Sequence, residues 1–302
     1  MFNNSIKNHG IDVAVVIVTF NPELVKLKLL LAALNNKCNQ IYLVDNNSNN
    51  VAEIMQISAS QDTVTPIFNK TNLGIAAAQN QGIKLSIASG CSFTLLFDQD
   101  SLPQDDFIEK LVFSYYQINE FRKVSAIGPN LYDSRYDFNY SFVILNKYGF
   151  RKKFVPDVTH KSPVPVSCLI ASGMLINNAS ISTIGLMNEE LFIDYVDTEW
   201  CLRSKSLGYA IFMAPNVKLE HEIGDANFSF LSYRIPVHSP WRRYYRVRNG
   251  FRLLGMHHVP LLMSLREILF SLIHQAILFL NTKDKRYLNN YVKSIRDAFK
   301  KS

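Results

Sequence analysis

The sequence predicts an α/β fold in which a mostly parallel central sheet is flanked by helices. Short, unbroken runs of β-branched and other apolar residues alternate with longer mixed segments over the first two thirds of the chain. Such runs are typical of strands buried on both faces, and their alternation with helical segments is typical of right-handed crossovers between parallel strands. In addition, polar residues follow several of these runs, as expected where parallel strands end at a shared binding site.

The first hundred residues contain the clearest elements. Strands are expected in VAVVIVTF (13–20), QIYLVDNNS (40–48), TPIFNKTNLG (65–74) and CSFTLLFDQD (91–100). Helices are expected at 23–34 and, from its Ala, Gln and Leu content, at 75–89. The order of strands and helices is that of a parallel sheet.

The middle of the chain is less regular. VSAIGPN (124–130) predicts a further strand, and 131–165 predicts loops and irregular strands. VPVSCLIASGMLINN (164–178) is expected to form one apolar strand that contains Ser172 and Gly173. We expect a helix within 191–209 that ends near Gly208, followed by strand 211–225, which ends at His221 and a glycine turn.

The C-terminal region differs from the rest in charge. Residues 239–302 carry 13 Lys and Arg against 3 Asp and Glu, whereas residues 1–238 carry 19 against 22. We therefore predict one α/β domain at 1–238 and a basic, amphipathic helical region at 239–302. Nucleic acid, anionic lipid or simply solvent could face such a region. No nucleic-acid motif is present, and no nucleic-acid partner is expected.

One apolar segment in this region, VPLLMSLREILFSLIHQAILFL (259–280), raises the question of a membrane span. Arg266, Glu267 and His274 interrupt it, and two serines share a helical stripe with Glu267 and His274. The pattern favours an amphipathic helix over a span. Such helices could lie on the bilayer or form a homodimer interface.

Composition indicates an ordinary globular protein. The chain has 302 residues, of which 48% are hydrophobic and 19% charged. The polar first residues predict no secretory signal. Four scattered cysteines without a CxxC pair argue against a disulfide framework or a zinc site and favour a reducing cytoplasm.

The candidate site is the set of polar residues at the strand ends. These residues are Thr19, Asn21, Asp45, Asn46, Asn47, Asp98 and Asp100. Two carboxylates one residue apart suit a hard cation such as Mg²⁺ or Mn²⁺, whose open positions phosphate oxygens can fill. The same pair on a loop could instead be solvated or cap a turn. Neither GxxxxGK[ST] nor GxGxxG follows the first strand, so P-loop NTPases and dinucleotide dehydrogenases are not favoured.

Several motifs taken together resemble family 2 glycosyltransferases of the GT-A fold. They occur in the order VTFNPE, VDNNS, NLGIAAAQNQG, DQD, SGMLI, DYVDTEWCLR and LEHEIG, over roughly residues 11–225. Within that family, FDQDS, DYVDTEWCLR and PWRRYYRVRN look most like bacterial rhamnosyltransferases. These are similar to enzymes that use dTDP-L-rhamnose to build O-antigen or capsular polysaccharide.

The resemblance implies roles for individual residues. The nucleotide base would be held by Thr19, Asn21 and Asp45, and the base and ribose by Asn72 and Gly74. Of the carboxylate pair, Asp98 would face the ribose and Asp100 would bind the metal. Gly173, in SGMLI, would also contact the nucleotide sugar. The Arg-aromatic segment, residues 240–249, includes Arg243 and offers guanidinium groups suited to phosphate. We expect Arg243 to contact the donor diphosphate, although the phosphate of a lipid-linked acceptor or of membrane headgroups could be the target instead. Simpler alternatives are a helix cap for Asn72 and backbone freedom for Gly74.

The resemblance also implies a catalytic base at the start of the 191–209 helix. Where the family often has Glu-Asp, this chain has Val196–Asp197, so Asp197 is the candidate. Asp194 and Glu199 flank it, and either could share or displace that role. A carboxylate in the first turn also stabilises a helix N-terminus, and this structural interpretation is favoured for Asp194 and Glu199. His221 could complete the metal shell or hydrogen-bond the diphosphate.

The sequence thus predicts an inverting, metal-dependent transferase at the cytoplasmic face of the membrane. It would move L-rhamnose, or another deoxy-sugar or galactofuranose, from a dTDP-sugar to an undecaprenyl-diphosphate-linked glycan. A non-catalytic nucleotide-sugar-binding or scaffolding subunit remains an alternative. A nucleotidyltransferase is disfavoured because TFNPELV lacks the Gly-rich, basic loop of that class.

Overall fold

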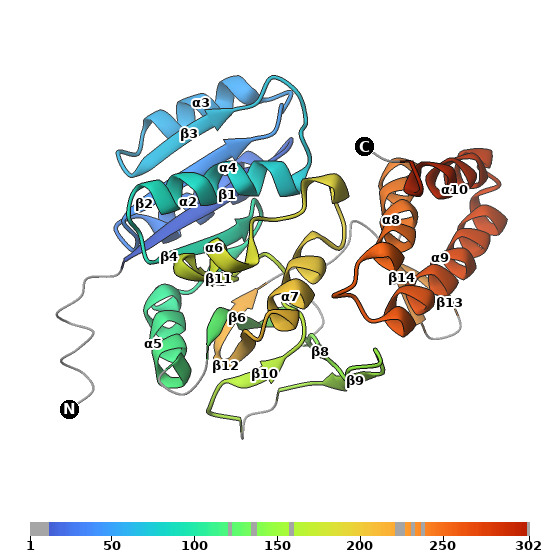
Figure 1. Ribbon diagram of the computed structural model, residues 1–302. Coiled ribbons are helices and arrows are strands. Elements are labelled where there is room, and N and C mark those ends of the chain that lie inside the picture. Colours follow the sequence, from blue (N-terminus) through green and yellow to red (C-terminus); the bar gives the residue numbers. More distant parts are fainter. Residues whose placement is uncertain are drawn as a thin grey trace.

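The computed structural model describes most of the chain. The described residues are 12–119, 123–133, 138–156, 160–220, 227–230, 233–236 and 239–300. Within them, one large mixed sheet forms the centre of the protein and three C-terminal helices form a cluster beside it (Figure 1). The predicted α/β class is therefore confirmed.

The first half of the sheet is parallel and matches the predicted strands. It consists of β1 (Val13–Thr19), β2 (Gln40–Asp45), β3 (Val64–Phe68) and β4 (Phe93–Asp98). The strands lie in the order β4-β1-β2-β3. All seven residues of β1 are buried, which explains its unbroken β-branched sequence.

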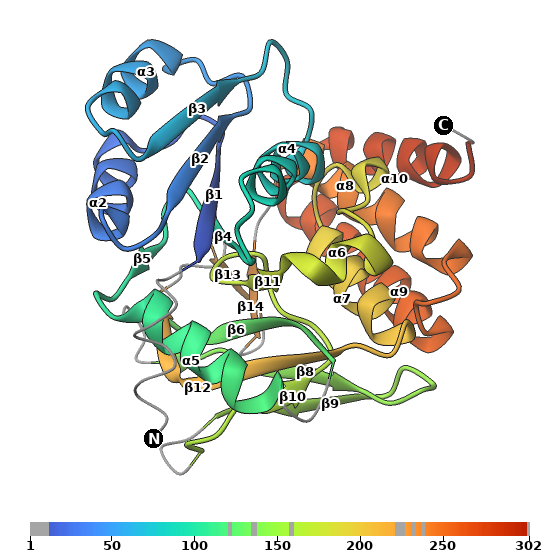
Figure 2. The same ribbon diagram turned by 60° about the vertical axis from the view of Figure 1, so that its left-hand side comes forward.

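The connections between these strands are helical and cover both faces of the sheet. They are α2 (Leu24–Leu34), α3 (Val51–Ala59) and α4 (Ile75–Ala88). Helices α2 and α3 lie on one face and α4 on the other (Figure 2). The chain moves outward from β1 to β3 and then returns to place β4 on the opposite side of β1. The C-terminal ends of β1 and β4 therefore form a topological switch point, where α/β proteins bind ligands.

The second half of the sheet is mixed. It contains β5 (Leu102–Pro103), β6 (Val124–Asp133), β7 (Phe138–Asn139), β10 (Val164–Val166), β11 (Leu175–Asn177) and β12 (Ala210–Glu220). Strand β11 is antiparallel to both β4 and β6 and joins the two halves. A separate hairpin pairs β8 (Phe142–Leu145) with β9 (Arg151–Phe154). A second small hairpin pairs β13 (Asn227–Phe230) with β14 (Tyr233–Pro236).

The prediction of one strand over 164–178 is wrong. The segment forms two short strands, β10 and β11, separated by a turn. Gly173 in this turn has φ +80°, and a Cβ there would lie 2.7 Å from Pro129 Cγ and 2.9 Å from Leu219 Cδ2. The backbone must therefore leave the extended conformation before β11 begins, and it does so at the strand-end edge of the sheet.

The remaining helices lie in the second half of the chain, apart from α5. They are α5 (Phe107–Asn119), α6 (Asn178–Ile184), α7 (Val196–Ser206), α8 (Pro240–Arg252), α9 (Leu261–Thr282) and α10 (Lys285–Ala298), with short 3-10 turns η1 (Glu189–Leu191) and η2 (Leu253–Gly255). Helix α7 ends just before Gly208, which has φ +83°, as predicted. Helices α3 and α5 were not among the predicted elements.

The C-terminal helices are joined to the sheet domain by a second hydrophobic cluster. Leu145 of the β8–β9 hairpin and Leu202 of α7 pack there with Leu253, Val259 and Met263. Apolar burial of this kind fixes the position of α8 and α9 against α7. The helical region predicted at 239–302 therefore packs directly against the helix that carries Asp197.

Two helical glycines test how closely α4 packs on β1 and α8 packs on α9. A Cβ on Gly82 of α4 would overlap both methyl groups of Val16 in β1, whereas a Cβ on Gly250 of α8 would lie 3.8 Å from Ile268 Cγ1. We expect Gly82→Ala to lower the free energy of unfolding by about 1–3 kcal/mol through overpacking. Gly250→Ala should raise it by about 0.5–1 kcal/mol through helix propensity. Urea unfolding of both variants checks this, and equal effects would contradict the fitted contact between α4 and β1.

Candidate functional site

The side-chain amide of Gln99 joins the ends of β1 and β4 at the topological switch point. Gln99, between the two aspartates that follow β4, accepts a hydrogen bond from Phe20 N at 2.8 Å and donates one to Phe20 O at 3.4 Å. Phe20 directly follows β1. Gln99 thus continues the β1–β4 pairing by one step beyond the sheet, which sets where Asp98 and Asp100 leave it.

Thr19 and Asp45 contact each other across the ends of β1 and β2. Both are fully buried, and Thr19 Oγ1 donates to Asp45 Oδ1 at 2.9 Å. Asp45 also accepts from the hydroxyl and, at 2.9 Å, from the backbone N–H of Ser48. The structure therefore brings Thr19 and Asp45 together in a hydrogen-bonded turn. That they contact the nucleotide base stays a prediction.

The other residues predicted for the base and ribose belong to the same network. Asn21, with φ 49°, accepts from Asn49 N at 2.8 Å and so ties the β1 loop to the β2 loop. Asn72 Oδ1 accepts from Gly74 N at 2.9 Å and from Asn46 Nδ2 at 3.0 Å. Asn72 therefore forms an Asx-type turn at the start of α4, close to the capping alternative considered above.

Asp98 and Asp100 differ in their surroundings. Asp98 is half-buried, its backbone N–H donates weakly to Ser172 Oγ at 3.4 Å, and Ser172 Oγ lies 2.5 Å from Ser101 Oγ. Asp100 is exposed. Gly173 is buried, and its positive φ and close packing against Pro129 and Leu219 explain why glycine occupies this position. Its contact with the nucleotide sugar stays a prediction.

Asp197 lies in the first turn of α7 and approaches Asp98. Its Oδ1 accepts from Thr198 N at 2.6 Å, and its Oδ2 accepts from Ala171 N at 3.2 Å. Ala171 is adjacent to Ser172, which bonds to the backbone of Asp98. The 167–174 turn between β10 and β11 thus brings the two carboxylates together from distant parts of the chain.

The environment of Asp197 raises the pKa of its carboxyl group to about 6. Burial is the largest cause, and the nearby charge of Asp98 adds to it, whereas the hydrogen bonds from Thr198 and Ala171 oppose it. A carboxylate with such a pKa is a stronger base than a solvated one and remains ionised at neutral pH. Among the predicted acidic residues, this combination identifies Asp197 as the best candidate for a general base.

The loop before α7 has an unusual backbone. Phe192, Asp194 and Tyr195 all have φ near 64°, and such positive φ values cost non-glycine residues about 1–3 kcal/mol each. Phe192, with ψ −64°, is the central residue of a γ-turn closed by Ile193 N and Leu191 O at 2.7 Å, whereas Tyr195 is left-handed. Phe192 O accepts from Ile75 N at 2.7 Å, and a Cβ on Gly74 would lie 2.6 Å from Phe192 Cδ2. Glycine at position 74 therefore allows the loop 192–195 to pack against the Asn72–Gly74 turn.

The two acidic neighbours of Asp197 are engaged in ion pairs. Glu199 is buried, pairs with Arg203 at 2.8 Å and lies 2.7 Å from His258 Nε2. The side chain of Asp194 is also buried, 3.5 Å from Arg242 and 3.6 Å from Arg246. Both carboxylates hold structure around α7, in line with the structural interpretation favoured for them from sequence.

The expectation that Arg243 contacts the nucleotide sugar is contradicted by the structure. Arg243 is 1% exposed, and its guanidinium group bonds to Ser271, Gln275 and His274 of α9. Burial, reinforced by Arg246, lowers its pKa to about 10. Arg243 therefore links α8 to α9 and has no group free to reach a diphosphate.

The metal prediction rests on a small set of ligands. Among the described residues, no three His, Cys, Asp or Glu side chains gather closely enough to hold a metal ion. His221 lies outside the described residues. Asp98 and Asp100 nevertheless fit Mg²⁺ or Mn²⁺, because such ions are commonly held by one or two carboxylates, with water and phosphate oxygens completing the shell. The mutual repulsion of Asp98 and Asp197 also leaves negative charge that a cation would neutralise.

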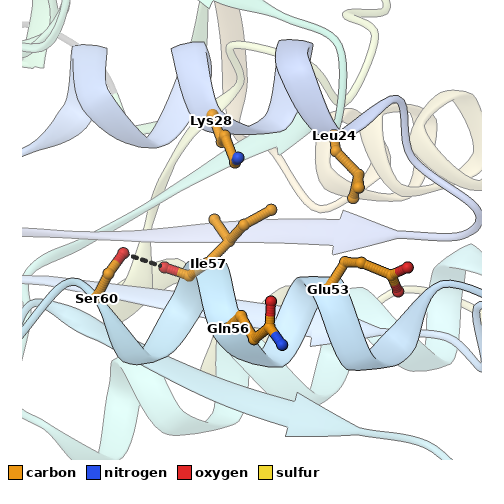
Figure 3. Close-up of a pocket in the computed structure, with 6 residues that line it drawn as sticks. All are labelled: Leu24, Lys28, Glu53, Gln56, Ile57 and Ser60. Carbon is orange, nitrogen blue, oxygen red and sulfur yellow. Dashed lines mark hydrogen bonds between the residues drawn. The ribbon is translucent and has the colours of Figure 1, made fainter.

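A separate pocket lies away from these residues. It is lined by Leu24, Lys28, Glu53, Gln56, Ile57 and Ser60, between α2 and α3 (Figure 3). Helices α2 and α3 cover one face of the sheet, and the pocket contains none of the predicted site residues. We assign the site to the strand ends, where the hydrogen-bonded polar network and the raised pKa occur.

Sequence reasoning missed several residues that shape the site. Gln99, Ser48, Ser172 and the loop residue Phe192 received no role, because each acts on the backbone of a segment distant in sequence. The available signals were weak: Gln99 stands between two aspartates, and Ser172 precedes a glycine. The Arg-aromatic segment 240–249 had a clear signal, but it was interpreted as a phosphate-binding cluster.

Comparison with known proteins agrees with this geometry. Residues 14–171 match the model of glycosyl transferase family 2. The chain is 40% identical over 291 residues, 96% of both chains, to a dTDP-rhamnosyl transferase, RfbF, from Shigella flexneri.

Two solved structures share the fold. TarS 1–349 from S. aureus, in complex with UDP-GlcNAc, is 12% identical, with a TM-score of 0.57 over 95% of this chain and 80% of TarS 1–349. GalNAc-T7 with UDP, GalNAc and Mn²⁺ is 15% identical, with a TM-score of 0.58 over 82% of this chain. This chain spans about half, 48%, of that protein. The family match and the full-length relative together show that the chain is a glycosyltransferase and belongs to glycosyl transferase family 2.

Proposed function

We propose that the protein transfers L-rhamnose, with inversion, from dTDP-L-rhamnose to a lipid-linked glycan during synthesis of a bacterial surface polysaccharide. The observation that carries the proposal is the approach of Asp197, with its raised pKa, to Asp98 at the switch point. The choice of sugar rests on the 40% identical dTDP-rhamnosyl transferase. The expected acceptor is a glycan on undecaprenyl diphosphate.

In the proposed reaction, Asp197 is the general base. Its carboxylate accepts the proton of the acceptor hydroxyl as the hydroxyl oxygen attacks the anomeric carbon. The bond from that carbon to the donor's phosphate oxygen breaks, and the electron pair leaves with dTDP. Attack from the face opposite the leaving group inverts the configuration. Hydrogen bonds from Thr198 N and Ala171 N orient the carboxylate for this step.

The leaving diphosphate carries charge that needs compensation. Asp100 would hold Mg²⁺ or Mn²⁺, which when bound would supply positive charge to the diphosphate. Asp98, two residues before it, would face the ribose. Thr19, Asn21, Asp45, Asn72 and Gly74 form the adjoining turns and are proposed to recognise the thymidine. His221, outside the described residues, is a further proposed ligand.

The experiment that tests this proposal is release of dTDP from dTDP-L-rhamnose in the presence of a lipid-linked acceptor and Mg²⁺ or Mn²⁺. We expect Asp100→Ala and Asp197→Ala to abolish release, because one removes a metal ligand and the other the base. Chelation by EDTA should have the same effect as Asp100→Ala. Asp105→Ala is the matched control, because Asp105 is an exposed carboxylate, 95% accessible, a few residues away.

The outcomes separate the alternatives. Faster release of UDP from a panel of UDP-sugars would overturn the choice of donor and leave the fold unaffected. Tight binding of dTDP, measured as thermal stabilisation, without turnover of any donor would favour a non-catalytic subunit. Near-normal turnover by Asp197→Ala would remove that residue from the role of base.

The raised pKa of Asp197 predicts a pH dependence. A base must be deprotonated to accept a proton, so kcat/KM should fall as the pH drops below about 6 and should decline tenfold per pH unit further down. An ordinary aspartate would place this limb near pH 4. Donor turnover measured from pH 4.5 to 8 at constant ionic strength checks the position of the limb. Constant kcat/KM between pH 5 and 7 would contradict the assignment.

Helix α9 supports the proposed contact with an anionic membrane. The polar stripe predicted on it, including Ser264 and Ser271, is buried against the other C-terminal helices, and its large apolar residues face outward. The outward residues are Leu261, Leu262, Leu265, Leu269, Phe270, Leu272, Ile273 and Leu280. By length and composition α9 could also cross a membrane, with a hydropathy of 1.5. Its polar bonds to Arg243 favour a helix that lies on the surface.

The charge of this region suits anionic lipid. Lys283, Lys285 and Arg286 directly follow α9 in the chain, and Lys293 lies on α10. We therefore place the enzyme at the cytoplasmic face of the cell membrane, with 1–238 as the catalytic domain and 239–302 as the basic helical region.

Negative charge introduced on the apolar face of α9 tests membrane contact. We expect Leu265→Glu combined with Leu269→Glu to weaken binding to vesicles that contain phosphatidylglycerol by at least tenfold, with little change in thermal stability, because both side chains are exposed. Val25→Glu, on an exposed position of α2, is the control and should bind as the wild type does. Unchanged vesicle binding together with a change from dimer to monomer would show that this face is a homodimer interface.

A further inference from the structure

The strained loop 192–195 is held by helix α8. Three of its four residues have positive φ, and Asp197 follows two residues later. Such a backbone persists only where surrounding contacts determine it. Among the described residues, two of its four carbonyl oxygens, those of Ile193 and Asp194, accept from Asn249 of α8. The other two accept from backbone N–H groups of α4 and of α7.

Asn249 makes the central contact. It is fully buried, and its Nδ2 lies 2.7 Å from Leu191 O, 2.8 Å from Ile193 O and 3.1 Å from Asp194 O. The two amide hydrogens are shared among these three acceptors. One side chain therefore bonds to carbonyl groups on both sides of Phe192 and of the left-handed turn at Asp194.

Arg248 fixes the orientation of this amide. Its Nε and Nη2 donate to Asn249 Oδ1 at 3.1 Å and 2.9 Å, so the oxygen faces Arg248 and the nitrogen faces the loop. Arg248 Nη2 also donates to Glu190 O at 2.7 Å. The two residues thus form a single clamp on the chain that leads to Asp197.

The rest of α8 reinforces the same loop. Tyr245 stacks on Phe192, with ring centroids 4.5 Å apart and an interplanar angle of 12°. Arg242 and Arg246 flank the buried Asp194 carboxylate. The loop in turn contacts the proposed donor side, because Phe192 O accepts from Ile75 N at the start of α4.

We propose that Asn249 is a positioning residue for glycosyl transfer, which sets the place of Asp197 by holding the carbonyl groups of the loop 192–195, with Arg248 as its support. The proposal rests on the proposed role of Asp197 as base. It gives the C-terminal helical region a part in catalysis that is separate from membrane contact.

The test is Asn249→Asp, which keeps the size of the side chain and removes both amide hydrogens. We expect kcat to fall by about 10- to 100-fold, while KM for dTDP-L-rhamnose and thermal stabilisation by dTDP change by less than about twofold. The amide hydrogens of Ile75 and Ala171, which bond to the loop and to Asp197, should exchange faster. Asn290→Asp is the control, because Asn290 bonds to Pro240 O within the same helices and should alter neither quantity.

A second pair of variants covers the case in which Asn249→Asp does not fold. Arg248 is partly exposed, so Arg248→Ala should fold, lower kcat and speed exchange at the same two amides. Arg248→Lys, which can still donate to the loop, should restore most of kcat.

The other outcomes decide whether Asn249 and Arg248 position Asp197. Unchanged kcat and unchanged exchange in the clamp variants would overturn the positioning role, as would a loss confined to donor KM. If the wild type turns over no donor, the proposed function fails, and exchange at Ile75 and Ala171 still tests the clamp.

Discussion

Two carboxylates held close together, Asp98 and Asp197, impose the constraint on which the rest of the site depends. Burial, with the repulsion from Asp98 added to it, raises the pKa of Asp197 to about 6, and this repulsion is unfavourable unless other groups fix the geometry. Three sets of hydrogen bonds fix this geometry. Backbone N–H groups of Ala171 and Thr198 donate to Asp197, the hydroxyl groups of Ser101 and Ser172 contact each other next to Asp98, and Gln99 bonds to Phe20 across the switch point. A cation bound at Asp100, near Asp98, would relieve the same repulsion, which would link metal binding to the protonation state of the proposed base.

Much of the sheet was predictable because its strands carry their own signal. Strand β1 is buried on both faces, so its run of β-branched residues is unambiguous, and the same logic located β2 and β4. The segment 164–178 was misassigned because apolar composition does not distinguish one strand from two strands joined by a buried turn. Only the packing of Gly173 against Pro129 and Leu219, which are distant in sequence, explains where the strand must break.

The site was partly predictable for a related reason. The positions of Asp98, Asp100 and Asp197 follow from strand ends and a helix start, which sequence patterns reveal. The partners of Arg243 could not be predicted from such patterns. An arginine among aromatic residues looks the same in sequence whether it binds an anion or is buried between helices. Its burial against Ser271 and Gln275 depends on the inverted arrangement of α9, with polar residues inward, which hydropathy alone does not orient.

Helix α8 divides its residues between two tasks, and its spacing explains how. Arg243, Val247 and Gly250 recur at intervals of three and four and are buried, with Arg243 bonded to α9 and Gly250 facing it. Tyr245, Arg248 and Asn249 lie on another side and contact the loop before Asp197. Because a helix transmits displacement as a nearly rigid body, a shift of α9 at a membrane would be felt at the loop carbonyl groups. The basic helical region and the loop before Asp197 are therefore in direct contact, although the sequence separates them by composition.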